Sequence, residues 1–355
     1  AFPDVFREDG GGGFDVVLGN PPWERIKLQE KEFFADKDEK TANAGTAAAR
    51  RRLIAQLPRT DPDLHAAYTE ALRESEATSH FLRESGRYPL SAVGDINTYQ
   101  VFAGLGRQIV GPRGRVGVVV PSGIATDYYN QDYFSTIVEE RELVSLYDFE
   151  NREGLFAGTH RSYKFCLLTL TGGSAPEAEF AFFLHTVGEL ADPERRFGLS
   201  REEVALLNPN TGTVPIFRTR RDAELTKKLY RAAPVLVNEE EGENPWRVSF
   251  LRMFDMTNDS HLFHTRDELE AQGYKLLGNV FQDKSEAFLP LYEDWMIHLF
   301  DHRYLSQGLD EVGTSEHRQS DFVPMPRYWV ASKEIEKSLE GVADVKSWFL
   351  GFRNR

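Results

Sequence analysis

Cysteine, basic residues and long apolar runs are all scarce in this chain. Its 355 residues include one cysteine, Cys166, which excludes a disulfide within the chain and fits a reducing cytoplasm. Lys and Arg number 42 against 56 Asp and Glu, for a net charge of −14. A dedicated nucleic-acid coat would be basic, although a local groove can be positive on an acidic protein. No run is long enough to cross a bilayer and no signal peptide is visible, so we expect a cytoplasmic protein without a membrane partner.

Hydrophobic residues are plentiful, at 41% of the chain, and their arrangement predicts strands that alternate with helices. Apolar runs rich in β-branched residues are typical of strands buried in a sheet. Such strands are predicted at 14–18, 115–120, 143–149 and 163–171. Since helical patterns separate them, the order predicts a doubly wound α/β sheet.

A charged, Ala-rich segment at 24–92 interrupts this order and is helical in pattern. Asp61 followed by Pro62 predicts a helix N-terminus, because Pro is well tolerated at the first helical position. The run Arg50-Arg51-Arg52 could meet phosphate, but a helix face in water is the better interpretation.

The later part of the chain is less regular. Residues 222–231 predict a short helix with Leu225 and Leu229 facing inward. An acidic break at 239–244 marks the best candidate boundary, and mixed short elements follow it.

The most informative stretch is Gly19-Asn20-Pro21-Pro22-Trp23, directly after the first predicted strand. The two prolines fix their φ angles, and Asn20 is extended because it precedes a proline. Its side-chain carbonyl and nearby main-chain carbonyls can therefore point at one spot without ordering cost. Trp23 offers a flat face beside that spot, although a Trp packed on an ordinary turn is the alternative. Acceptors beside a ring suit a planar ligand that carries an amino group.

Asn20-Pro21-Pro22-Trp23 after a strand resembles motif IV of the amino-methyltransferases that use S-adenosyl-L-methionine. These enzymes modify adenine N6 or cytosine N4 in DNA, and related ones modify guanine N2 or a protein glutamine. Later segments resemble motifs V to VIII in order, at 95–99, 114–122, 147–151 and 156–165. Blocks at 256–260, 290–293 and 326–329 are similar to the large adenine-specific methylases of type IIG restriction–modification and of the BREX and DISARM phage-defence systems.

The resemblance implies the C-terminal half of a Rossmann-like methyltransferase sheet plus a mixed α+β specificity-type domain. Residues 1–175 would be a partial catalytic domain, 176–238 a connecting segment and 239–355 the start of a target-recognition-type domain. In this family the strand and Gly-rich loop that hold S-adenosyl-L-methionine precede motif IV. No cofactor-binding residue is therefore assigned, and we expect those motifs upstream of Ala1, in a longer protein of which this chain is an internal piece.

The resemblance also implies the roles of the site residues. Asn20 and the Pro21 carbonyl would accept the two amine hydrogens of a flipped adenine, and Trp23 would stack on its ring. Tyr163 is the candidate second wall of the base pocket, with core packing an equal alternative, and Phe165 is the fallback. Double-stranded DNA is the implied partner, together with restriction or defence-system subunits.

Two acidic residues at a strand end, Asp148 and Glu150, could be interpreted as a metal or acid–base pair. Methyl transfer requires neither, so we expect no metal. His298 and His302 are spaced i,i+4, but they lack the flanking pattern of a zinc site.

Two rival functions stay open. One is a DNA- or partner-recognition module without chemistry of its own, which the acidic charge favours slightly and Asn20 and Trp23 disfavour. The other is a methyltransferase that acts on protein glutamine or RNA guanine, although such enzymes tend to be short.

Overall fold

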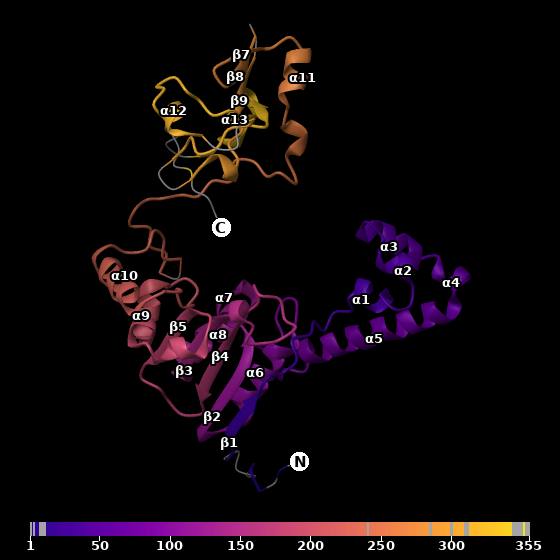
Figure 1. Cartoon of the computed structure of the whole chain (residues 1–355), viewed down its shortest axis with the longest axis vertical. Coiled ribbons are helices and arrows are strands. Elements are labelled where there is room, and N and C mark those ends of the chain that lie inside the picture. The colour runs from indigo at the N-terminus through magenta and orange to yellow at the C-terminus, as the bar shows by residue number, and fades with distance from the viewer. Residues whose placement is uncertain are drawn as a thin grey trace. The chain divides into compact units, whose positions relative to one another are not determined.

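The chain forms two compact units, Ala1–Val248 and Ser249–Arg355 (Figure 1). The computed structural model describes residues 2, 4–6, 12–239, 241–283, 286–298, 301–308, 312–342 and 351. Within these ranges, no helix has the length and apolar character needed to cross a membrane.

A six-stranded sheet in the order β1-β2-β4-β3-β5-β6 organises the first unit. The predicted α/β class is confirmed, but the sheet is mixed and not parallel throughout. β1 is parallel to β2 and β3 to β5, whereas β4 runs antiparallel between β2 and β3. The strands are β1 Phe14–Gly19, β2 Val110–Pro121, β3 Leu143–Glu150, β4 Lys164–Thr171, β5 Ala178–Leu184 and β6 Phe197–Leu199.

Helices pack on the sheet through one main hydrophobic core, to which strand residues such as Val118 and Leu168 contribute. Alternate strand residues face a second cluster around Phe149 and Phe165, where Trp23 and Phe156 come from loops. The helices that share the main core are α6 Thr98–Ile109, α7 Gly123–Thr126, α8 Gln131–Glu139, α9 Arg201–Leu207 and α10 Arg220–Ala232. The doubly wound arrangement is therefore wrong for the described part of the chain, because loops cover the second face.

The first strand was expected to be buried, and this expectation is wrong. β1 stands at the edge of the sheet, where Val16 and Leu18 are 66% and 83% exposed. Val17 alternates to the other face and packs against the main core. An apolar sequence predicts a strand, but the number of its neighbours decides whether the strand is buried.

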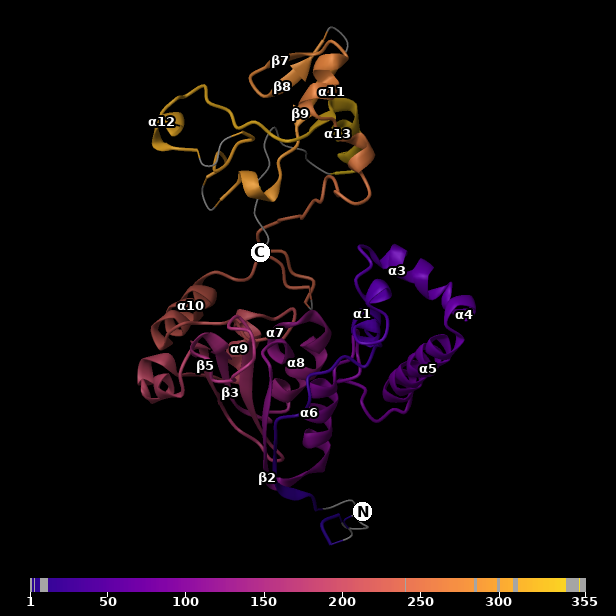
Figure 2. The same ribbon diagram turned by 45° about the vertical axis from the view of Figure 1, so that its right-hand side comes forward.

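A helical arm at residues 24–92 follows the loop after β1. Asp61 accepts a hydrogen bond from the Leu64 N–H and starts α5, so the predicted helix start is confirmed. Figure 2 shows the arm running out through α1 to α4 and returning through α5. Its helices are α1 Glu30–Phe34, α2 Glu39–Ala42, α3 Ala47–Ile54, α4 Leu57–Thr60 and α5 Pro62–Glu84.

The predicted inward face of α10 is wrong. Leu225 and Leu229 are 55% and 57% exposed, whereas Ala223 and Lys227 are buried. The Lys227 ammonium lies 3.0 Å from the Glu203 carboxylate of α9. A buried ion pair has displaced the leucines outward, which hydrophobic periodicity does not predict.

Residues 176–238, which the sequence suggested as a connecting segment, contribute β5, β6, α9 and α10 to the first unit. The roles predicted for the three parts of the chain stay predictions.

The second unit contains a four-stranded sheet in the order β10-β9-β8-β7, antiparallel at each pairing. Trp329 is 2% exposed, and its indole N–H donates to the Asn279 carbonyl at 2.7 Å. His298 forms an isolated bridge with Asp301, and His302 lies in a turn, so the two histidines do not share a helix face. The elements are β7 Lys275–Leu277, β8 Val280–Gln282, β9 Ala287–Pro290, β10 Trp329–Ala331, α11 Arg266–Ala271, α12 Thr314–His317 and α13 Ser332–Ser338.

Candidate functional site

The loop at residues 20–23 leaves the carboxyl end of β1. Gly19 is paired with Val118 in the parallel strand β2, so this loop lies at the edge where β2 also ends. In open α/β sheets, ligands bind outside the carboxyl ends of the parallel strands. β4 runs the other way, so it begins at this same edge with Phe165 opposite Pro121.

Hydrogen bonds hold the loop on two sides. The Trp23 indole N–H donates to the Val119 carbonyl of β2 at 3.3 Å. The Thr98 hydroxyl donates to the Pro22 carbonyl at 2.5 Å and accepts from the Glu24 N–H at 3.0 Å. Since Thr98 is the first residue of α6, the loop is clamped between the sheet and the start of that helix. Residues 95–99 resemble a motif in the sequence, but the pattern does not predict this clamp.

Two acceptors of the loop are left unused. Neither the Asn20 side chain nor the Pro21 carbonyl makes a hydrogen bond to any part of the chain that the structure describes. Asn20 is exposed and Pro21 half-buried. Consecutive free acceptors on a clamped, proline-stiffened loop are what an amino group with two N–H hydrogens would need.

Trp23 and Phe165 are brought together by the structure. Both belong to the second hydrophobic cluster, where Phe165 is 4% exposed. Phe165 stacks on Phe149 with ring centroids 5.4 Å apart and meets Phe156 edge-on at 4.8 Å. Phe165 is thus a core residue in this structure, and Trp23 is half-buried against that core.

Tyr163 is placed differently. It lies just before β4 and is 54% exposed, and it is not a member of the cluster that holds Trp23 and Phe165. Its backbone is held by Asn151 and His160, through hydrogen bonds of 2.9 Å and 3.1 Å. Of the two candidates for a second wall of the pocket, Tyr163 is therefore the one with a ring accessible to a ligand.

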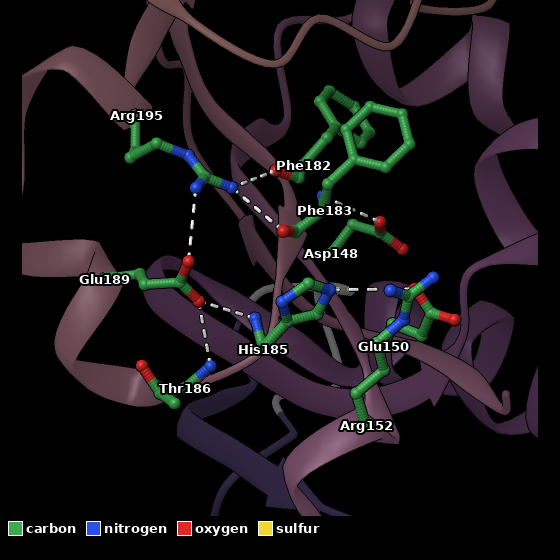
Figure 3. A network of polar contacts seen from close by, with 9 residues as sticks. All are labelled: Asp148, Glu150, Arg152, Phe182, Phe183, His185, Thr186, Glu189 and Arg195. Carbon is green, nitrogen blue, oxygen red and sulfur yellow. Dashed lines mark hydrogen bonds and ion pairs between the residues drawn. The ribbon is translucent and has the colours of Figure 1, made fainter. Parts of the chain in front are cut away.

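The Asp148 carboxylate accepts hydrogen bonds from residues other than Glu150. Asp148 is 7% exposed, accepts a short hydrogen bond from the Ser122 hydroxyl, and accepts one from the Phe183 N–H at 3.3 Å. Burial raises the pKa of the Asp148 carboxyl above its ordinary value, although these hydrogen bonds oppose the shift. Figure 3 shows this carboxylate beside the backbone of Phe183.

Glu150 has partners of its own. Its carboxylate lies 3.0 Å from Arg152 and 3.7 Å from His185, and the hydrogen bond from Arg152 lowers the pKa of Glu150. Figure 3 shows Glu150 facing these two side chains. Within the described ranges, no group of three or more His, Cys, Asp or Glu side chains could hold a metal ion.

A strained bulge in β5 was not predicted. Phe183 has φ +58°, which is rare for a bulky residue, and the β3–β5 register shifts there. Arg195 donates to the Phe182 and Phe183 carbonyls at 3.0 Å and 2.8 Å and pairs with Glu189 at 3.1 Å (Figure 3). Asp148 and Arg195 thus hold the strained backbone from both sides. Positive φ at a phenylalanine has no sequence signal.

No protein-family model matches the chain, and no curated protein matches it. Solved structures that resemble it include several restriction–modification proteins. A methyltransferase subunit of a type I restriction–modification system from Streptococcus thermophilus is 14% identical, with a TM-score of 0.32 over 40% of this chain and 35% of that one. The type IIG restriction endonuclease BpuSI is 16% identical, with a TM-score of 0.32 over 79% of this chain and 26% of that one. A protein of a type I R-M system is 14% identical, with a TM-score of 0.33 over 62% and 42%. The chain thus spans less than half the length of each.

Proposed function

We propose that this chain supplies the amine-binding half of a methyltransferase that modifies the N6 amino group of a flipped adenine in DNA, within restriction–modification or phage defence. The observation that carries the proposal is the clamped loop at residues 20–23, with free acceptors on Asn20 and Pro21 at the carboxyl edge of the sheet. Tyr163 precedes β4 at the same edge and is 54% exposed, which supports it as the second wall of the base pocket.

Adenine N6 is a poor nucleophile because its lone pair is delocalised into the ring. Asn20 Oδ1 and the Pro21 carbonyl would each accept one N–H, which localises the lone pair and orients it for in-line attack. The clamp by Thr98 and Val119 keeps this geometry without ordering cost at the moment of reaction. The base must leave the duplex to reach these acceptors.

The donor in this proposal is S-adenosyl-L-methionine, which supplies an electrophilic methyl group when bound. We assign no residue of this chain to hold it. β1 lies at an open edge of the sheet, and its own residues Val16 and Leu18 are exposed. A Cβ at Gly19 would meet no described atom within 4 Å. These features support a donor-binding segment that packs along β1.

The test is modification of DNA in a host that lacks methylation. When the protein is expressed in this host from its native reading frame, N6-methyladenine should appear at a defined DNA sequence. Modification-sensitive sequencing detects the modified base. Asn20→Ala should lower transfer by about 100-fold or more, because the amine loses one of its two partners. Its unfolding profile should not change, since the side chain bonds to no described residue. Asn43→Ala, at an exposed helix end in the arm, is the matched control.

Unmodified DNA from cells that contain soluble protein would overturn the proposal. Sequence-specific DNA binding without transfer would identify a recognition module instead. Methylated RNA or protein with unmodified DNA would favour the remaining rival.

A further inference from the structure

A groove lined by basic residues lies in the helical arm. We call it the arm groove: it has a volume of about 600 Å³ and lies between α3, α5 and the segment 25–31. One face of α5 forms its long wall, through Tyr68, Leu72, Ser75, Glu76, Ser79 and Arg83. These positions recur every three or four residues, so they share one helix face.

Cations outnumber carboxylates around the arm groove, although the whole chain has a net charge of −14. Six cations line it, namely Arg25, Lys27, Lys31, Arg50, Arg51 and Arg83. Three carboxylates also line it, namely Glu30, Glu76 and Asp95, which leaves an excess of three positive charges. None of the six cations forms an ion pair within 4.0 Å with a residue that the structure describes. Their charge is therefore available to an anion.

Arg50 also has a hydrogen-bond donor without a partner among the described atoms. Its Nε is buried and has no hydrogen-bond partner among the described atoms, while one Nη lies 3.5 Å from the Ala42 carbonyl. A guanidinium presents five N–H donors in a fixed fork that matches phosphate. Arg51 lies close enough to Tyr68 that its charge opposes the rise in the Tyr68 pKa that burial causes.

The length of the arm groove favours a nucleic-acid strand over a single phosphate. From Tyr68 to Arg83 the wall runs about 22 Å, at roughly 1.5 Å per residue. The charges of one strand of duplex DNA lie about 3.4 Å apart along the helix axis, so this wall is long enough to meet several successive phosphates. Tyr68 is the single aromatic residue in the lining, which suits contact with the backbone better than stacking on bases.

The lining of the arm groove begins close to the candidate loop in the chain. Arg25, which belongs to the lining, lies two residues beyond Trp23. The Ile26 N–H donates to the Ile96 carbonyl at 3.0 Å. The same pairing of segments includes the Thr98 contacts that clamp the loop at residues 20–23. A strand whose base enters that loop would have its flanking phosphates near the start of the arm groove.

We propose that the arm groove binds the phosphate backbone of the DNA that flanks the target base. The inference rests on the proposed function for the identity of the nucleic acid. It adds a binding surface that the loop at residues 20–23 does not contain. Backbone contacts of this kind position DNA without reading its sequence.

The test measures binding of the chain to a fluorescent duplex of mixed sequence at several salt concentrations. Arg50→Ala/Arg51→Ala should weaken binding about tenfold or more and reduce the slope of log affinity against log salt by about 2, since two phosphate contacts are lost. Arg52→Ala/Arg73→Ala removes the same charge from exposed positions outside the lining and should change affinity less than about threefold.

Arg50 is half-buried, so its loss could loosen the arm. Lys27→Ala/Lys31→Ala provides a second variant, because both side chains are exposed at the rim of the arm groove. This variant should also reduce the salt slope by about 2. Thermal unfolding followed by circular dichroism identifies any variant that has lost its fold.

Equal losses in the arm-groove and control variants would show a bulk charge effect and overturn the inference, as would unchanged binding in both arm-groove variants. Absence of DNA binding by the unaltered chain would overturn it too. Displacement of the duplex by ATP at micromolar concentration would indicate a mononucleotide site instead. Failure of the proposed function looks different: the arm groove would still bind DNA, but DNA from the methylation-free host would be unmodified.

Discussion

The six-stranded sheet ends differently at its two edges. At the β6 edge, Phe197 and Leu199 are 2% and 1% exposed, and α9 and α10 pack into the same core. At the β1 edge, Val16 and Leu18 are 66% and 83% exposed, and β1 has no second strand neighbour among the described residues.

Proteins usually protect a sheet edge by shortening, charging or covering it. β6 follows this practice, with three residues under helices, whereas β1 has six residues and an exposed apolar face. β1 also leads directly into the loop with the free acceptors of Asn20 and Pro21. The sheet is therefore covered at the edge far from the candidate site and open at the edge that carries it.

Truncation at the two edges should have very unequal effects on stability. Phe197→Ala removes a ring whose centroid lies 5.9 Å from that of Phe180 and 5.5 Å from that of Phe217. It should lower the free energy of unfolding by about 3–5 kcal/mol. Leu18→Ala should change it by less than about 0.5 kcal/mol. Urea denaturation followed by circular dichroism measures both, and equal losses would contradict the contrast between the edges.

A methyl group added at Gly19 tests whether a ligand occupies the space at the open β1 edge. Gly19 does not have a left-handed backbone, and a Cβ there meets no described atom within 4 Å. Gly19→Ala should therefore leave the free energy of unfolding within about 0.5 kcal/mol, yet lower methyl transfer roughly tenfold if a ligand fills that space.

Gly45 has equally empty surroundings in the helical arm, so Gly45→Ala is the matched control for both measurements. Full activity of Gly19→Ala would indicate that only solvent occupies the space at the β1 edge.

The smallest effect on stability is expected for Asp148, which lies in the inner strand β3. Because burial raises its pKa, the folded state binds the Asp148 proton more tightly than the unfolded state does. Stability should therefore fall as pH rises from the unfolded value of about 3.9 up to the raised folded value, and stay level above it. Asp148→Asn removes this contribution and keeps the shape of the side chain.

The measurement is the urea midpoint of both proteins between acidic and neutral pH. The midpoint of Asp148→Asn relative to the unaltered chain should rise across that window and then become constant. Lys164 and Glu150 also act on this carboxyl, but both are present in the two proteins. Parallel pH profiles would show that Asp148 titrates as an exposed carboxyl does.

Much of the secondary structure could be predicted because it depends on near neighbours in the chain. Asp61 and Pro62 identify the start of α5, and the β-branched run in β2 identifies a strand. The inward face of α10 could not be predicted in this way, since the buried Lys227 pairs with the carboxylate of Glu203 on another helix.

In the candidate site, too, some features can be predicted from the sequence and others cannot. The stiff loop at residues 20–23 and its acceptors can be identified from the sequence. The clamp by Thr98, the burial of Phe165 and the exposure of Tyr163 could not, because each depends on residues far apart in the chain.

The strands, the helix starts and the polar, proline-stiffened loop can be predicted from the amino-acid sequence, since they follow from local propensity and fixed φ angles. The open edge at β1 and the groove that Arg50 and Arg51 line together with Arg25 and Arg83 become visible only in the folded chain. The physical reason is that burial and charge clustering arise from residues far apart in the chain, whose meeting no local pattern records.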